Sequence, residues 1–189
     1  MYQAPIFSEL ENYKNSNLPW LDFTVYFGSK LSLKETYHHT FKSKFKNDYE
    51  DILKGYNYEF LKNYTFYEKE GIFSRVNLGI IPKILFGKYD VVLLHGYNTL
   101  TSILILFLCL LSGKKIIFRG ESILRGNEGS LSIKNRVKTM YLNTFLSLCD
   151  KVLYSCSGNK DFFLNYKVPI EKLIYIPCAV NNNFFQDNI

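Results

Sequence analysis

The sequence predicts an α/β fold in which a mostly parallel sheet is covered by helices. The first observation is that two short apolar runs, 90–94 and 115–118, flank a longer one. Short runs without alternation are typical of interior parallel strands, because both faces of such strands are buried. The second observation is that strand-like and helix-like segments alternate from residue 90 to residue 176, which is the pattern of β-α-β units.

The longest apolar run indicates a buried helix, not a membrane span. From Ile103 to Leu111 nine consecutive residues are apolar, and Ser112 and Gly113 end the run. A bilayer span needs about 20 apolar residues. We therefore predict a helix over 98–112 that is apolar on all sides, with Asn98 or Thr99 as its N-cap and Gly113 as its C-cap.

The other elements follow from local signals. Pro5 predicts the start of a helix, since proline is tolerated in the first turn. Residues 21–27 alternate with period two and predict a strand that Gly28 ends. The remaining expected elements are a long loop over 29–55, either irregular throughout or with a short helix, a short strand at 58–61, a helix over 77–86 that contains Pro82, an amphipathic helix over 133–149, a strand at 151–154, a helix that Ser157 or Asn159 caps and that ends at Asn165, and a strand at 172–176.

The helix over 133–149 has apolar residues at helical spacing, while its lysines and arginine face elsewhere. This spacing predicts a core face made of Val137, Met140, Tyr141, Thr144, Phe145 and Leu148.

Composition narrows the class of protein. The 189 residues are 47% apolar, which is enough for one α/β domain. The net charge of +6 is spread along the chain without a tract of five or six basic residues, so we expect no nucleic-acid partner. The four cysteines show no CxxC pair and no zinc spacing, and no signal peptide is evident. We expect reduced cysteines, no metal and a cytoplasmic protein.

Polar residues follow the predicted strands at one edge of the sheet, where parallel sheets bind ligands. The segments are 95–98 (HGYN), 119–122 (RGES), 155–157 (SCS) and 177–178 (PC). Glycines let the backbone turn and let a ligand approach closely. An arginine can hold a phosphate or carboxylate, and a glutamate can accept hydroxyl hydrogens.

Each of these residues also has a structural interpretation. His95 can be an ordinary residue at a strand end, and Arg119 and Glu121 can form an ion pair with each other. Their position at one sheet edge favours a site. His38 and His39 have no evident partner, so they are not counted as site residues.

Four stretches resemble the N-terminal half of family 4 glycosyltransferases. They are YQAPIFSEL, DVVLLHGYNTLTS, KKIIFRGES and DKVLYSCSGNKDFFLNYKVPIEKLIYIPCAV. The resemblance runs from residue 2 to about 185 and is weakest over 29–80. It implies the GT-B architecture, in which two Rossmann-like domains enclose the active site. Residues 1–180 would form the N-terminal domain, a Rossmann-like, mostly parallel sheet with helices on both faces, and 181–189 would begin the interdomain linker.

The resemblance also implies an activity. The family transfers a sugar from a nucleotide sugar to a hydroxyl with retention of configuration, without a metal or other cofactor, and its N-terminal domain mostly binds the acceptor. By resemblance His95, Arg119 and Glu121 are the catalytic candidates. Many relatives have a histidine where this chain has the arginine, which is a departure from the family. The expected substrate-binding residues are Gln3, Gly96, Tyr97, Asn98, Gly120 and Ser122.

Two parts of the family pattern do not occur in this sequence: the first strand, and the C-terminal domain that binds the donor. We therefore expect the acceptor-side half of a glycosyltransferase, inactive alone, that acts on a lipid-linked or polysaccharide hydroxyl, with the missing domain as a separate chain. The alternative is a non-catalytic Rossmann-like interaction module or degenerate fragment. The basic, aromatic residues 36–67 suggest either a core or a surface for sugar rings or for the inner face of the membrane.

Overall fold

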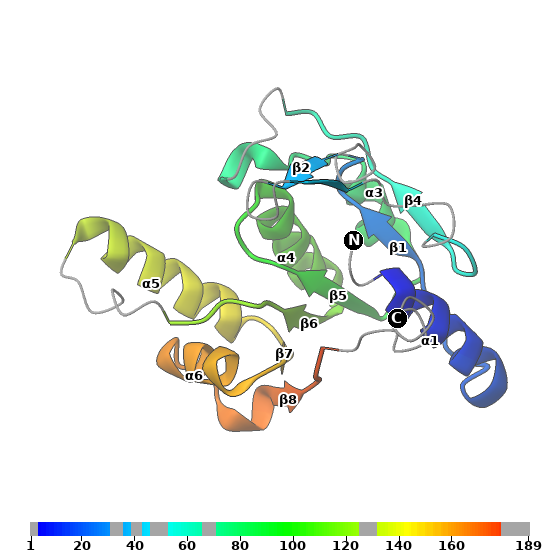
Figure 1. Cartoon of the computed structure of the whole chain (residues 1–189). Helices are drawn as coiled ribbons and strands as arrows, with labels where there is room; N and C mark the ends of the chain where they lie inside the picture. The colour runs from blue at the N-terminus through cyan, green and yellow to red at the C-terminus, as the bar shows by residue number, and fades with distance from the viewer. Residues whose placement is uncertain are drawn as a thin grey trace. The chain divides into compact units, whose positions relative to one another are not determined.

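The chain contains two compact units. The computed structural model describes residues 4–30, 36–38, 43–45, 53–65, 71–124 and 132–178. One unit comprises Met1–Asn63 with Ala179–Ile189, and the other comprises Tyr64–Cys178. Figure 1 shows their elements, and each unit holds parallel strands of its own.

The first unit begins with a helix and continues with short strands. Pro5 lies in the first turn of its helix, as predicted. Strands β1 and β4 pair in parallel, whereas β2 and β3 form an antiparallel pair. That pair lies within 29–55, so the prediction of a loop there was wrong at these residues. The elements are α1 (Ala4–Asn17), β1 (Val25–Phe27), β2 (Thr36–His38), β3 (Ser43–Phe45) and β4 (Tyr58–Phe60).

Aromatic rings build the core of this first unit. The Phe7 and Tyr56 rings lie 5.6 Å apart, and Phe27 stacks on Phe60 with centroids 5.1 Å apart. Tyr56 is buried, and Lys30 Nζ lies 5.6 Å from the centre of the Phe60 ring. These ring contacts stabilise the unit, because aromatic rings remove a large apolar area from water when they pack together.

The second unit is a parallel α/β structure. Its four strands pair in the order β5-β6-β7-β8, and every pair is parallel. This arrangement confirms the predicted α/β class with a parallel sheet flanked by helices. The elements are η2 (Ile72–Ser74), α3 (Ile80–Phe86), β5 (Val91–His95), α4 (Leu100–Ser112), β6 (Lys115–Arg119), α5 (Ile133–Ser147), β7 (Lys151–Tyr154), α6 (Ser157–Asn165), η3 (Ile170–Lys172) and β8 (Leu173–Tyr175).

The ends of the helices show which caps the local sequence signals predicted correctly. Thr99 Oγ1 accepts a hydrogen bond of 3.1 Å from the Ser102 amide, and Gly113 takes the left-handed conformation with φ 68°, both as predicted. Pro82 is the third residue of α3, where no amide hydrogen is needed, so it does not interrupt the helix. The predicted cap of α6 was wrong, because its N-cap is Cys156 and no side chain caps it.

Phe118 joins the sheet of the second unit to two helices. Its side chain is fully buried, with the ring of Phe145 of α5 at 5.6 Å and that of Phe163 of α6 at 6.0 Å. Both pairs are edge-to-face, a favourable geometry for aromatic rings. The other large, fully buried side chains of this core include Phe162, Ile116, Leu142, Leu146 and Val152.

Burial is more one-sided than the sequence suggested. In α4, Leu106, Leu108 and Cys109 are buried, but Phe107 and Leu111 are exposed, so the prediction of burial on all sides was wrong. Strand β5 lies at one end of its sheet, not in the interior as predicted, and its alternate side chains reach solvent. Among the described residues, no helix is long and apolar enough to cross a membrane.

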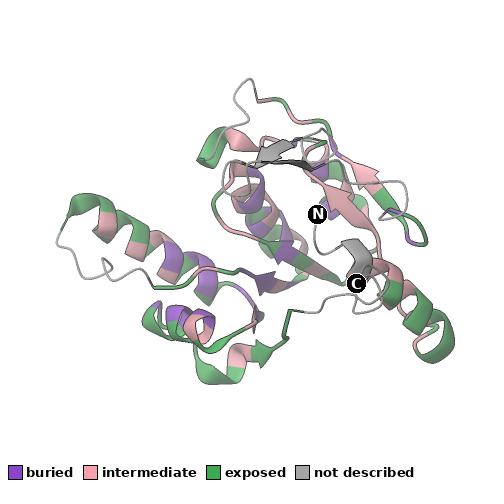
Figure 2. Ribbon diagram, in the orientation of Figure 1, coloured by how far each residue is buried: buried purple, intermediate pink, exposed green. Residues whose placement is uncertain are grey.

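The predicted core face of α5 was confirmed at Phe145 and was wrong at Val137 and Met140. Val137 and Met140 are 56% and 67% exposed, whereas the buried residues are Leu142, Phe145 and Leu146. Figure 2 shows that burial in α5 is confined to the end nearest the sheet. The helix carries two apolar stripes, and the buried one consists of Leu142, Phe145 and Leu146, with Phe145 in contact with Phe118.

Asp150 fastens the start of β7 to the start of β6. Its carboxylate accepts hydrogen bonds from the Ile116 amide at 2.9 Å and from Lys115 Nζ at 3.0 Å. These bonds, with the Ile116 amide contributing most, hold the pKa of Asp150 below its usual range. A carboxyl with a lowered pKa stabilises the fold above its unfolded pKa, and this stabilisation is lost as the pH falls through the folded pKa.

We predict that Asp150→Ala lowers the free energy of unfolding by about 1 kcal/mol at pH 7, the usual net value of one such hydrogen bond. Urea denaturation at pH 7 and at a pH below the normal carboxyl range measures the effect. The difference from the wild type should shrink at the lower pH, where Asp150 is protonated. Asp161→Ala, at an exposed position of α6, is the control and should change little. An equal loss in both variants would contradict this role.

Candidate functional site

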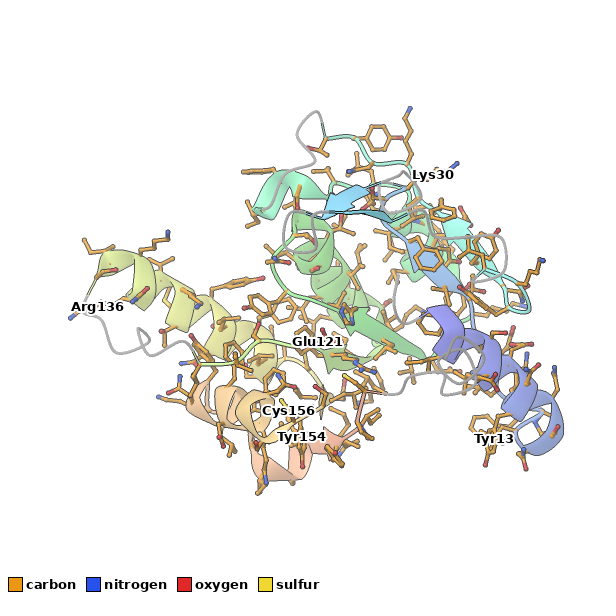
Figure 3. The ribbon with its side chains drawn as sticks, in the orientation of Figure 1. Tyr13, Lys30, Glu121, Arg136, Tyr154 and Cys156 are labelled. Atoms are coloured by element: carbon orange, nitrogen blue, oxygen red, sulfur yellow. The ribbon has the colours of Figure 1, made fainter. Side chains whose placement is uncertain are left out.

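The carboxyl ends of β5 and β6 bring the strongest candidates together. His95 and Arg119 are register partners at the ends of these strands. The Gly96 amide donates a 2.9 Å hydrogen bond to the Arg119 carbonyl, and Gly96 has φ 80°, which favours glycine. Glu121 follows two residues after β6 (Figure 3). We call His95, Arg119 and Glu121 the strand-end cluster.

Arg119 is the most unusual member of this cluster. Arg119 is only 9% exposed. Its guanidinium donates a hydrogen bond of 3.9 Å to the Sγ atom of Cys178, and a thiol sulfur is a weak acceptor. Within the described part of the chain, no ion pair joins Arg119 to Glu121, so the alternative of a simple ion pair is not observed. Burying a cation without a carboxylate is costly. An anionic ligand at this edge would offset that cost.

Burial and two charged neighbours set the pKa of His95. Loss of solvent around the ring lowers its pKa below the ordinary value of 6.5, and the charge of Arg119 lowers it further. The charge of Glu121 opposes both effects. His95 remains exposed to solvent at the end of β5. The cluster thus combines a neutral imidazole, a fixed cation and a carboxylate, a set that can bind a phosphate and the hydroxyls of a sugar.

Tyr97 and Ser122 hold the loops after β5 and β6 together. The Tyr97 hydroxyl and Ser122 Oγ lie 3.1 Å apart, and the Tyr141 hydroxyl donates to the Tyr97 carbonyl. The Ser122 carbonyl accepts from Asn159 Nδ2 at 2.9 Å, while Asn159 Oδ1 accepts from the Ser155 amide at 3.1 Å. These contacts make Tyr97 and Ser122 supports of the site in this structure.

The other expected site residues lie in different situations. Gly120 is buried, and a Cβ atom there would lie 2.9 Å from the Phe118 ring, so a larger residue would require Phe118 to shift. Asn98 is exposed, with Oδ1 3.8 Å from the position of a Cβ on Gly96. Gln3 lies outside the described residues. No group of three or more His, Cys, Asp or Glu side chains in the described ranges could hold a metal ion.

Three contributors to this edge were not assigned from sequence. Tyr141 was predicted only as a core residue, Asn159 only as a cap of its own helix, and Cys178 only as part of a strand end. Burial raises the pKa of Tyr141 to about 12, so its hydroxyl remains a donor. The sequence holds no signal for these partners, because each contact joins residues far apart in the chain.

The fold and the strand-end cluster define a Rossmann-like α/β protein. The chain matches no protein-family model and no curated protein. Solved structures do match. The crystal structure of Anabaena Alr3699/HepE in complex with UDP and glucose superposes with a TM-score of 0.55 at 11% identity, covering 97% of this chain and 42% of that one. The same protein in complex with UDP gives 0.51 at 11% identity, covering 96% and 42%. This similarity confirms the predicted fold, and the chain spans 42% of the length of HepE.

We predict opposite shifts of the His95 pKa when its two neighbours are neutralised. Glu121→Gln removes a charge that stabilises the imidazolium and should lower the pKa, while Arg119→Gln removes a repelling charge and should raise it. NMR titration measures both, with His95→Gln to assign the resonance among the three histidines. In the wild type, the stability that neutral His95 contributes should be lost as the pH falls below 6.5. Shifts of the same sign in both variants would refute the geometry.

We predict that Gly120→Ala destabilises the fold by about 1–3 kcal/mol, the usual cost of inserting a methyl group into a packed core. Gly158→Ala is the matched control. A Cβ atom there makes an ordinary contact of 3.5 Å with Ile123, and alanine favours the helix. Thermal denaturation should show a lower midpoint for the first variant and an equal or higher one for the second. Equal midpoints for the wild type and Gly120→Ala would mean that Phe118 can move aside.

Proposed function

We propose that this chain is the acceptor-side half of a glycosyltransferase that transfers a sugar from a nucleotide sugar to a hydroxyl with retention of configuration. The observation that carries the proposal is the buried Arg119, which lacks a carboxylate partner among the described residues and stands beside His95 and Glu121. The fold shared with a protein solved with UDP and glucose supports it. So does the resemblance of the 90–122 segment to family 4 glycosyltransferases.

The strand-end cluster has the chemistry that such a transfer needs. Negative charge develops on the diphosphate as the glycosidic bond breaks, and a fixed guanidinium stabilises that charge. The carboxylate of Glu121 accepts hydroxyl hydrogens of the sugar, and the neutral imidazole of His95 donates and accepts one hydrogen bond each. No step in this scheme draws on a metal or another cofactor.

In this scheme a second domain binds the base and ribose of the nucleotide sugar. This chain contacts the diphosphate and the sugars. The acceptor is proposed to be a lipid-linked or polysaccharide hydroxyl. The full reaction then needs the second domain, whether it belongs to a longer protein or to a separate chain. The coverage of only 42% of HepE is consistent with this division.

We predict that glucose 1-phosphate and UDP-glucose shift the His95 resonance of the full chain at similar, millimolar concentrations, whereas uridine does not. Arg119→Ala should weaken both by roughly 10- to 150-fold, because a hydrogen bond to a charged group contributes about 1.5–3 kcal/mol. NMR titration gives the dissociation constants. Arg136→Ala, which removes an exposed arginine of α5, is the control and should leave them unchanged.

The outcomes separate the competing functions. Tight binding of uridine would place the donor base on this chain and overturn the division of labour. Absence of any shift with all three probes would overturn the site and favour the non-catalytic interaction module. In an assay with the donor domain supplied, Arg119→Ala and Glu121→Ala should both abolish transfer, and full activity of the two variants would remove them from the site.

A further inference from the structure

The buried residues of helix α5 all lie near one of its ends. All of its buried residues, Leu142, Phe145 and Leu146, lie in its second half. We call residues 133–140 the outer half, and none of these residues is buried. Figure 1 shows α5 (yellow) running outward from the sheet, and Figure 2 shows buried residues only at its inner end.

The outer half presents an apolar stripe to solvent. Ile133, Val137 and Met140 are 80%, 56% and 67% exposed. Their spacing of four and three residues places them on one face of the helix. They do not contribute to the core, which the other stripe of α5 serves. Scattered exposed apolar residues are normal, but a row of three on a projecting helix indicates a surface that is covered in use.

Basic side chains surround this stripe. Lys134, Arg136 and Lys138 are all exposed, and α5 has no acidic residue from Ile133 to Ser147. At 100° per residue, Lys134 lies on one side of the stripe and Arg136 on the other. Figure 3 labels Arg136 at the outer end of the helix. Long basic side chains can keep their charges at a polar boundary while their stems lie along apolar surface.

We propose that the outer half of α5 binds the surface of an anionic membrane. Ile133, Val137 and Met140 enter the headgroup region, and the three cations lie at lipid phosphates. A helix with an apolar stripe between basic flanks is the pattern of interfacial helices that lie on bilayers without crossing them. This attachment goes beyond the proposed function and does not depend on it.

Charge complementarity favours an anionic bilayer over a protein or a nucleic acid as the partner of this helix surface. The centre of a protein interface is depleted in lysine, whereas here three cations lie between positions 134 and 138 of the helix that carries the stripe. Nucleic acid would pair with the cations but would leave the aliphatic stripe in water, since it offers phosphates and stacking surfaces for aromatic rings. An anionic bilayer provides phosphates and an apolar layer at the same boundary.

The test is co-sedimentation of the full chain with vesicles of phosphatidylcholine alone or with roughly 30% phosphatidylglycerol, which sets a negative surface potential. The wild type should bind the anionic vesicles and weaken with added salt. Arg136→Gln with Lys138→Gln should weaken binding at least tenfold, at about fivefold for each charge. Ile133→Ser with Val137→Ser and Met140→Ser should weaken it by about tenfold or more.

Matched controls keep the test specific. Lys88→Gln with Lys167→Gln removes two exposed cations elsewhere, and Phe86→Ser removes an apolar side chain that is 83% exposed on α3. Both should bind like the wild type, and circular dichroism and the melting midpoint should confirm that every variant folds. Equal binding to neutral vesicles, loss of binding only in the controls, or no binding at all would each overturn the proposal. So would a dimer that the stripe variant dissociates, or tighter binding to single-stranded RNA.

Discussion

The packing of one ring, Phe118, sets the orientation of much of the second unit. The ring is fully buried between Phe145 of α5 and Phe163 of α6, and it leaves no room for a Cβ atom at Gly120. Side chains alternate along a strand, so anchoring Phe118 to the helices turns Arg119 toward the other face. The parallel register then places His95 beside Arg119. The position of the candidate site thus follows from a packing contact.

The same edge combines rigid supports with an unsatisfied charge. Tyr97, Ser122, Tyr141 and Asn159 form hydrogen bonds that tie three loops together, so their polar groups are used inside the protein. Arg119 differs, because among the described residues its guanidinium donates a hydrogen bond only to the thiol of Cys178. A charged group kept in such a position costs stability, and sites that bind ligands are where such costs are usually found. This contrast separates the residues whose polar groups hold the edge together from Arg119, whose charge has no carboxylate partner among the described residues.

Helix α5 shows how one amphipathic segment can serve two purposes along its length. Its inner half supplies Phe145 to the core, and its outer half exposes Ile133, Val137 and Met140 among three cations. The same sheet therefore positions the strand-end cluster and holds a projecting basic helix.

Local signals in the sequence determined most of the second unit: the strands 115–119 and 151–154, the caps Thr99 and Gly113, and the parallel α/β class. They succeeded because hydrophobic runs and caps depend on neighbours a few residues away. Tertiary structure alone decided which stripe of α5 is buried, that β5 lies at a sheet edge, that the Asn159 amide supports Ser122 and does not cap α6, and that Arg119 meets Cys178 and not Glu121. Each of these depends on which distant surface a segment contacts, and periodicity within one segment carries no information about its partner.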